Sequence, residues 1–99
     1  MVQAQIFIDK DELRGTRPLY EFILLFLLEK NIAGATAFNG FMGFGKHQKL
    51  KRPNREFSFD ETPLVISFVD TKENVEEAIK ELRNVYSGGL IITHAVEQW

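Results

Sequence analysis

The order of hydrophobic patterns along the chain limits the folds that it can adopt. Residues 2–8 alternate polar and apolar side chains, which is the period-two pattern of a strand. Residues 18–30 are rich in apolar side chains, and residues 70–86 repeat them at helical spacing, so we predict that both stretches are helices. Three other stretches are predicted strands: 33–42, 64–69 and 90–96. The sequence therefore predicts an α+β fold with the order β-α-β-β-α-β.

This order is that of the ferredoxin-like split βαβ arrangement. We expect a four-stranded antiparallel sheet with two helices on one face, in a single domain over residues 1–99 with a long loop at about 44–60. The strand at 64–69 is apolar on both faces, although two helices cover only one. A sheet-to-sheet contact between subunits is the economical explanation. The first helix is apolar all round, so its extra surface either packs on the second helix or forms a further contact.

Composition excludes several classes of protein. The chain has no cysteine, which excludes disulfides, thiolate zinc sites and iron–sulfur clusters. Its longest apolar run, residues 22–28, is too short to cross a membrane, because a spanning helix needs roughly 20 apolar residues. Residues 1–8 have no basic region typical of a signal peptide. We therefore expect a cytoplasmic protein without a membrane span.

Positive charge is concentrated in one segment. The chain has 12 basic and 14 acidic residues, and five of the basic ones fall within residues 46–55, where there is no acid. Such a local field is typical of a site for an anion or a protein partner, although a solvated loop would also carry charge. Four residues are assigned to a partner-binding loop: Lys49, Lys51, Arg52 and Arg55.

Glycines precede this basic segment at positions 40, 43 and 45. They could let backbone amides approach a phosphate, or they could serve a bulge or turn where the strand leaves the sheet. Their spacing does not match a Walker loop. The segment 40–44 superficially resembles an aromatic RNA-binding signature, but it leads into a loop, and the rest of the chain is acidic. Nucleic-acid binding is therefore a minor alternative.

Other polar residues give weaker signals. His47 and His94 are too far apart in sequence to indicate a metal site, so we predict none. Asp9, Asp11 and Glu12 form an acidic segment that we interpret as a solvated turn, since no partner base or nucleophile accompanies it. We assign no catalytic residue and identify no cofactor. Trp99 is expected to pack at a subunit interface, with stacking on a ligand as the alternative.

Several segments, taken in order, resemble one protein family: Pro18 to Glu21, Ile32 to Thr36, Gly40 to Gly45, Thr62 to Ile66, and Val69-Asp70. They resemble the Domain of Unknown Function 190 family, which is similar to the nitrogen-regulatory PII signalling proteins. The resemblance covers nearly the whole chain. It implies a ferredoxin-like homotrimer in which the loop at 44–60 corresponds to the PII T-loop. Small effectors of PII proteins, often adenine nucleotides, bind in the clefts between subunits.

The resemblance also implies ligand-binding positions. Gly43, Gly45, Lys46 and His47 lie at the base of the T-loop, and Gly88 and Gly89 lie where PII proteins have a phosphate-binding turn. The turn here lacks the basic residues of PII proteins, and the loop has no tyrosine to match the PII uridylylation site. We expect a regulatory protein that senses an anionic metabolite or nucleotide, with a protein partner at the basic loop. The alternatives are an enzyme acting on a phosphate ester or anhydride, disfavoured because no nucleophile–base set is evident, and a nucleic-acid-binding module.

Overall fold

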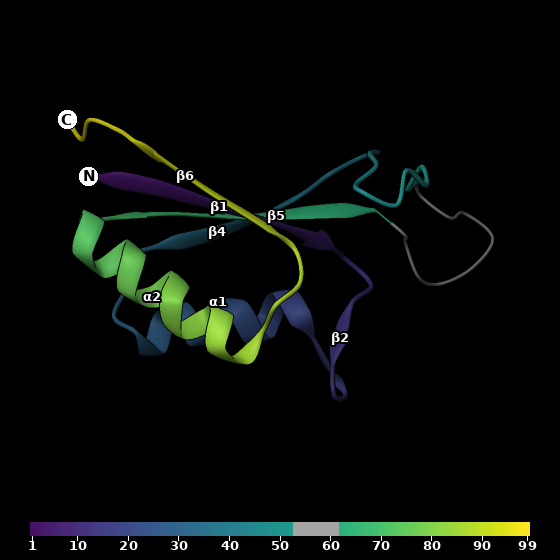
Figure 1. Ribbon diagram of the computed structural model, residues 1–99, viewed down its shortest axis with the longest axis horizontal. Helices are drawn as coiled ribbons and strands as arrows, with labels where there is room; N and C mark the ends of the chain where they lie inside the picture. Colours follow the sequence, from purple (N-terminus) through teal and green to yellow (C-terminus); the bar gives the residue numbers. More distant parts are fainter. Residues whose placement is uncertain (53–61) are drawn as a thin grey trace.

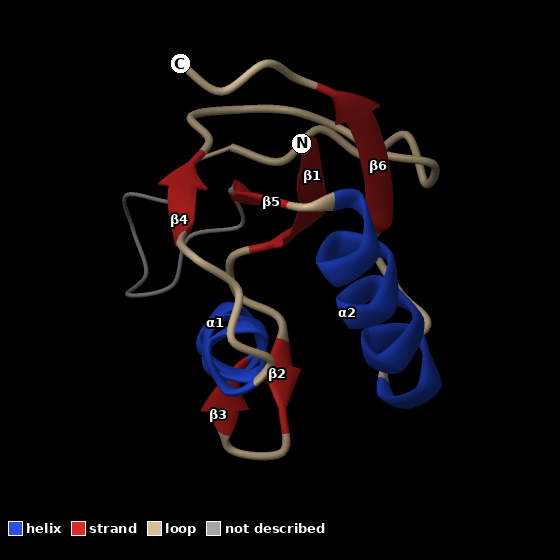
Figure 2. Cartoon of the chain, turned by 90° about the vertical axis from the view of Figure 1, so that its left-hand side faces the viewer, coloured by secondary structure: helices blue, strands red, loops and turns tan. Residues whose placement is uncertain are grey.

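The computed structural model describes residues 1–52 and 62–99. Four strands form one antiparallel sheet in the order β4-β5-β1-β6, and they comprise β1 (Val2–Asp9), β4 (Ala35–Asn39), β5 (Pro63–Asp70) and β6 (Leu90–Ala95). The helices α1 (Leu19–Glu29) and α2 (Lys72–Val85) both lie on one side of this sheet, as Figures 1 and 2 show. The predicted ferredoxin-like βαββαβ arrangement is confirmed. Within the described ranges, no helix is long and apolar enough to cross a membrane.

The core lies between the helices and the covered face of the sheet. Alternation along β1 and β5 turns every second side chain toward the helices. Twelve buried core residues come from four elements, and Ile32 follows α1: Ala4, Ile6 and Ile8 of β1, Leu64, Ile66 and Phe68 of β5, Leu19, Ile23 and Leu27 of α1, and Val75, Ala78 and Leu82 of α2. The period-two and helical patterns in the sequence therefore identify most of these core positions.

The start of α2 is fixed by two side chains. Thr71 is the N-cap, and its hydroxyl accepts a hydrogen bond from the amide of Asn74. Asp70 is only 7% exposed; its carboxylate accepts from the amides of Thr71 and Ala33, at 2.7 and 2.9 Å, and from the side chain of Asn74. These hydrogen bonds lower the pKa of Asp70. The residue thus ties the start of α2 to the segment that leads into β4.

The second face of the sheet, which we call the open face, is covered by neither helix. Residues directly opposite each other in paired strands share a face, and one row across all four strands is apolar: Phe38, Val65, Phe7 and Leu90. Phe38 and Leu90, at the two ends of the row, are 57% and 59% exposed. The predicted two-faced apolarity of β5 is therefore confirmed, and it extends across the sheet. The neighbouring row, Thr36, Ser67, Gln5 and Ile92, is more polar, and the Ser67 hydroxyl accepts a hydrogen bond at 2.8 Å from Gln3 of the row beyond it.

Three details of the sequence prediction are wrong. The charged residues and Gly15 of segment 9–17 predict a loop, but the segment contains a hairpin of β2 (Leu13–Arg14) and β3 (Arg17–Pro18), with Gly15 at φ 65° in its turn. The second predicted strand ends at Asn39 rather than residue 42, because its partner β5 begins at Pro63 and only the amide of Gly40 still bonds to it. The helical spacing of apolar residues in α2 predicts a buried Val85, but this side chain is exposed in the last turn of the helix.

The outer surface of α1 is only partly covered. The guanidinium of Arg14 lies 4.5 Å from the ring centre of Phe22, and the ammonium of Lys30 lies 5.3 Å from that of Phe26. Leu28 remains 69% exposed. Part of the extra apolar surface of α1 is thus covered by cation–π contacts with Arg14 and Lys30, and the rest is exposed to solvent.

Candidate functional site

The base of the long loop is a closed structure. Gly43 and Lys51 are paired by two backbone hydrogen bonds, of 3.0 Å from the Gly43 amide and 2.7 Å from the Lys51 amide. Between them, the amide of Gln48 bonds to the carbonyl of Gly45 at 2.8 Å, with Gln48 at φ 55°. Four predicted ligand residues therefore lie together at this closed base, and we call them the loop half-site: Gly43, Gly45, Lys46 and His47.

The loop base presents cations and apolar side chains together. Lys46, His47, Lys49 and Arg52 are exposed, and Lys51 is half-buried. The apolar side chains beside them are exposed as well: Phe41, Met42, Phe44 and Leu50. Arg55, the remaining predicted partner-loop residue, lies outside the described residues. Gly45 has open space at its Cβ position and no positive φ, so the backbone does not require glycine there.

The turn between α2 and β6 does require its glycines. Gly89 adopts φ +67°, and an added Cβ would lie 2.9 Å from the carbonyl oxygen of Phe7. At Gly88 an added Cβ would lie 2.7 Å from the hydroxyl oxygen of Tyr86. Close packing therefore explains both glycines, and it brings the backbone of this turn against the first strand and the Tyr86 ring.

Two arginines surround the same turn. The guanidinium of Arg83 donates to the carbonyls of Gly88 and Tyr86, and that of Arg14 donates to the carbonyl of Val85 at 2.8 Å. In the described part of the chain, the amides of residues 87–89 have no hydrogen-bond acceptor. The turn thus combines two cations with unpaired N–H groups, which are the groups that bind anions in proteins. We call Arg14, Arg83, Gly88 and Gly89 the turn half-site.

Sequence reasoning missed both arginines. The Ser87-Gly88-Gly89 segment lacks a basic residue, but the structure brings two guanidinium groups to it from other elements. Arg83 could have been found, because basic side chains in the last turn of a helix often bond the final carbonyls. Arg14 is 71 residues from its acceptor, and no sequence pattern links the two.

The two half-sites lie at the same end of the sheet but at opposite edges. Gly40, where the chain leaves β4, bonds to Pro63, which is paired with Asp9 of β1. Phe7, two residues earlier in β1, is paired with Leu90 at the start of β6. Figure 2 shows β4 and β6 on opposite sides of β5 and β1. Three strand spacings place the edge strands about 14 Å apart.

The acidic segment after β1 is not simply a solvated turn. Glu12 accepts a hydrogen bond from the Tyr86 hydroxyl at 3.0 Å, although the two residues are 74 positions apart. Burial and this hydrogen bond raise the pKa of Tyr86. His94 lies on β6, paired with Gln3, so it does not belong to the His47 loop. The interpretation of Glu12 as solvated is therefore wrong.

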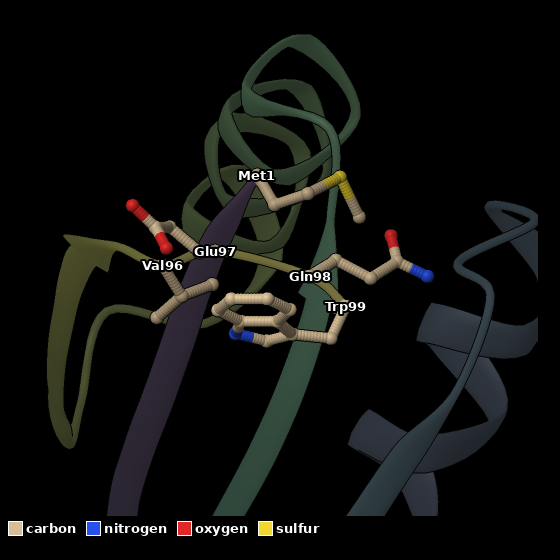
Figure 3. Close-up of a pocket in the computed structure, with 5 residues that line it drawn as sticks. All are labelled: Met1, Val96, Glu97, Gln98 and Trp99. Atoms are coloured by element: carbon tan, nitrogen blue, oxygen red, sulfur yellow. The ribbon is translucent and has the colours of Figure 1, made fainter.

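A separate hollow of about 470 Å³ lies at the other end of the sheet. It is bounded by the first residue and by the segment after β6: Met1, Val96, Glu97, Gln98 and Trp99 (Figure 3). The side chain of Trp99 is fully exposed. No residue of either half-site lines this hollow, so it is not part of the predicted ligand site.

Comparisons with known proteins agree with this fold. An UPF0166 protein of Aquifex aeolicus (strain VF5) is 27% identical over 93 residues, covering 94% of this chain and 88% of that protein. The structure of CPII from Thiomonas intermedia K12, bound to ADP and bicarbonate, superposes with a TM-score of 0.69 at 16% identity, covering 94% of this chain and 82% of CPII. CPII is described as a nitrogen regulatory PII-like protein.

A second protein of similar structure is the divalent ion tolerance protein CutA1 of Ehrlichia chaffeensis. Its TM-score is 0.63 at 17% identity, and the match covers 99% of this chain and 82% of CutA1. At such identities these structures establish the fold. Residues 1–98 match the family described as Uncharacterized ACR, which is Domain of Unknown Function 190. The chain therefore belongs to this family and has the ferredoxin-like fold of PII-like proteins.

Proposed function

We propose that this protein is a PII-like regulatory protein, a homotrimer that binds an anionic metabolite or nucleotide in the clefts between its subunits. The observation that carries the proposal is the separation of the loop and turn half-sites at opposite edges of one sheet. The strands that lead into the two half-sites are about 14 Å apart, so one small anionic group cannot reach the backbone of both in the same chain. It can touch both where the β4 edge of one copy lies beside the β6 edge of the next. Head-to-tail contacts of this kind close into a ring.

The surfaces that would meet are suited to such an assembly. The edge strands β4 and β6 contain no Asp, Glu, Lys, Arg or Pro, the residues with which exposed sheet edges are usually protected from pairing. The open face carries its apolar row from edge to edge, with exposed Phe38 and Leu90 at the ends. Burial of this row between subunits would remove apolar surface from water, and a chain of this size gains stability from such burial.

The chemistry of the two half-sites favours an anion. Lys46 supplies a cation at one edge, Arg14 and Arg83 supply cations at the other, and the amides of residues 87–89 are unpaired within the described structure. CPII, which shares the fold, is bound to ADP and bicarbonate in its structure, so these are the first ligands to test. The basic segment Lys49, Lys51, Arg52 and Arg55 would then contact a protein partner. The expected cytoplasmic location stays a prediction.

The proposal is tested by titration calorimetry and thermal shift with ADP, followed by bicarbonate, and by light scattering of the free protein. We expect the mass of a trimer, a higher melting temperature with ADP, and weaker binding by Lys46→Ala and Arg83→Ala. Lys80→Ala is the matched control, since this exposed lysine lies on α2 outside both half-sites. A monomer at micromolar concentration, or full ADP affinity in both variants, would contradict the proposal. Turnover of ADP would instead favour the enzyme alternative.

A further inference from the structure

Tyr86 connects the turn half-site to the β2–β3 hairpin. Its hydroxyl donates to Glu12 Oε2 at 3.0 Å, and its backbone carbonyl accepts from Arg83. Its ring packs directly on Gly88, where an added Cβ would lie 2.7 Å from the hydroxyl oxygen and 3.0 Å from Cε1. A change in the position of this ring would therefore change the space available to the backbone of residues 87–89.

Glu12 is itself held in place by the backbone around it. Its amide bonds to the carbonyl of Asp9 at 3.2 Å, and its carbonyl accepts from the amide of Leu19, the first residue of α1, at 2.9 Å. The hairpin makes a second contact with the end of α2 through Arg14, which bonds to Val85. The carboxylate that anchors Tyr86 thus belongs to a braced segment.

Direct contact with the ligand does not account for Glu12. A carboxylate beside an anion-binding turn repels an anion, so it would weaken binding if charge were its only effect. As a hydrogen-bond acceptor, by contrast, it fixes the phenol of Tyr86. The pKa of Tyr86 is raised by burial and by Glu12, so the phenol remains a donor at neutral pH.

We propose that Tyr86 and Glu12 are positioning residues of the turn half-site, which hold residues 87–89 in the conformation that receives the anionic group of the ligand. This inference rests on the proposed function, because it concerns the same site. Without the Tyr86–Glu12 hydrogen bond, the turn samples other conformations. The apparent affinity then falls in proportion to the fraction of molecules whose turn is competent.

The test uses ADP as the probe in titration calorimetry with the full chain. Tyr86→Phe keeps the ring and removes the donor, and we expect the affinity for ADP to fall about five- to tenfold. Glu12→Ala removes the same hydrogen bond but also a charge that repels the anion, so its loss of affinity should be smaller, and the double variant should bind ADP no more weakly than Tyr86→Phe. Glu12→Gln keeps an acceptor and removes the charge, so its affinity should equal or exceed that of the wild type.

Tyr20→Phe is the matched control. Tyr20 is the other tyrosine, it is half-buried in α1, and its hydroxyl has no hydrogen-bond partner among the described residues. Unchanged ADP affinity in Tyr86→Phe, or additive losses in the double variant, would overturn the inference.

A second measurement needs no ligand and separates this inference from the proposed function. NMR order parameters of residues 87–89 should decrease in Tyr86→Phe, whereas those of β1 should not change. If the wild type fails to bind ADP, the proposed function loses its support, and the order parameters still decide whether Tyr86 positions the turn. A uniform decrease throughout the chain would show that the hydrogen bond is merely structural.

Discussion

Replacement of Asp70 by asparagine should destabilise the fold by about 2–4 kcal/mol at neutral pH. The buried carboxylate accepts three hydrogen bonds with its two oxygens. Asparagine retains one acceptor oxygen, so its amide nitrogen must face a donor. If the oxygen stays with Thr71 and Asn74, the amide of Ala33 loses its partner. A hydrogen bond to a charged group is worth about 1.5–3 kcal/mol, and an unsatisfied buried donor adds to that loss.

The effect should depend on pH in a defined direction. The pKa of Asp70 is lower in the folded protein than in the unfolded chain. The stability that the ionised carboxylate gives the fold is therefore fully present above a pH of about 4, the ordinary pKa of aspartate. This stability is lost as the pH falls through the pKa of the folded state. Urea unfolding of the wild type and the Asp70→Asn variant, at one protein concentration, measures this effect. The two should differ in free energy of unfolding at pH 7, and the difference should narrow below about pH 4.

Asp11→Asn is the matched control, because this aspartate is exposed, and its unfolding should resemble that of the wild type. A difference in free energy of unfolding below about 0.5 kcal/mol at pH 7, between the wild type and Asp70→Asn, would refute the reasoning about Asp70. If the difference in stability persists unchanged below about pH 4, the ionised form of Asp70 is not what stabilises the fold.

Three further predictions concern the core, the turn and the assembly. Leu27→Ala should lower the free energy of unfolding by about 2–5 kcal/mol, whereas exposed Leu28→Ala should change it by under about 0.5 kcal/mol, as measured by urea titration. Gly89→Ala should destabilise by about 1–3 kcal/mol because of its positive φ and crowded Cβ position, while Gly45→Ala should melt like the wild type. Val65→Asp places a charge within the apolar row and should convert the proposed trimer to monomers in light scattering, so a variant that remains trimeric would show that this row is not the subunit interface.

The sheet and its core could be predicted because their patterns are long. β1 and β5 are each eight residues, which is enough for alternation to be visible, and the buried residues of α2 recur over about two turns. The β2–β3 hairpin could not be predicted, since each strand has only two residues and no period can be seen in two. The loop closure at Gly43 and Lys51 involves backbone atoms alone, so side-chain patterns contain no sign of it.

The candidate site was predictable only in part. Glycines and lysines can be recognised from their positions in a family pattern, which led to both half-sites. Arg14, Glu12 and Tyr86 act through contacts between residues more than 70 positions apart, and only the folded chain brings them together. The sequence also gave no indication that the two half-sites lie at opposite edges, because strand order in a sheet is not the order along the chain.

Placement of the half-sites at opposite edges has a genetic consequence. A chain with Lys46→Ala keeps an intact turn half-site, and a chain with Arg83→Ala keeps an intact loop half-site. If a cleft takes one half from each of two neighbours, random mixed trimers from equal amounts of the two chains should have about one cleft in four with both halves unaltered. Two defective alleles would then partly complement each other in one cell. If each chain built its own complete site, mixing the two chains would not restore ligand binding.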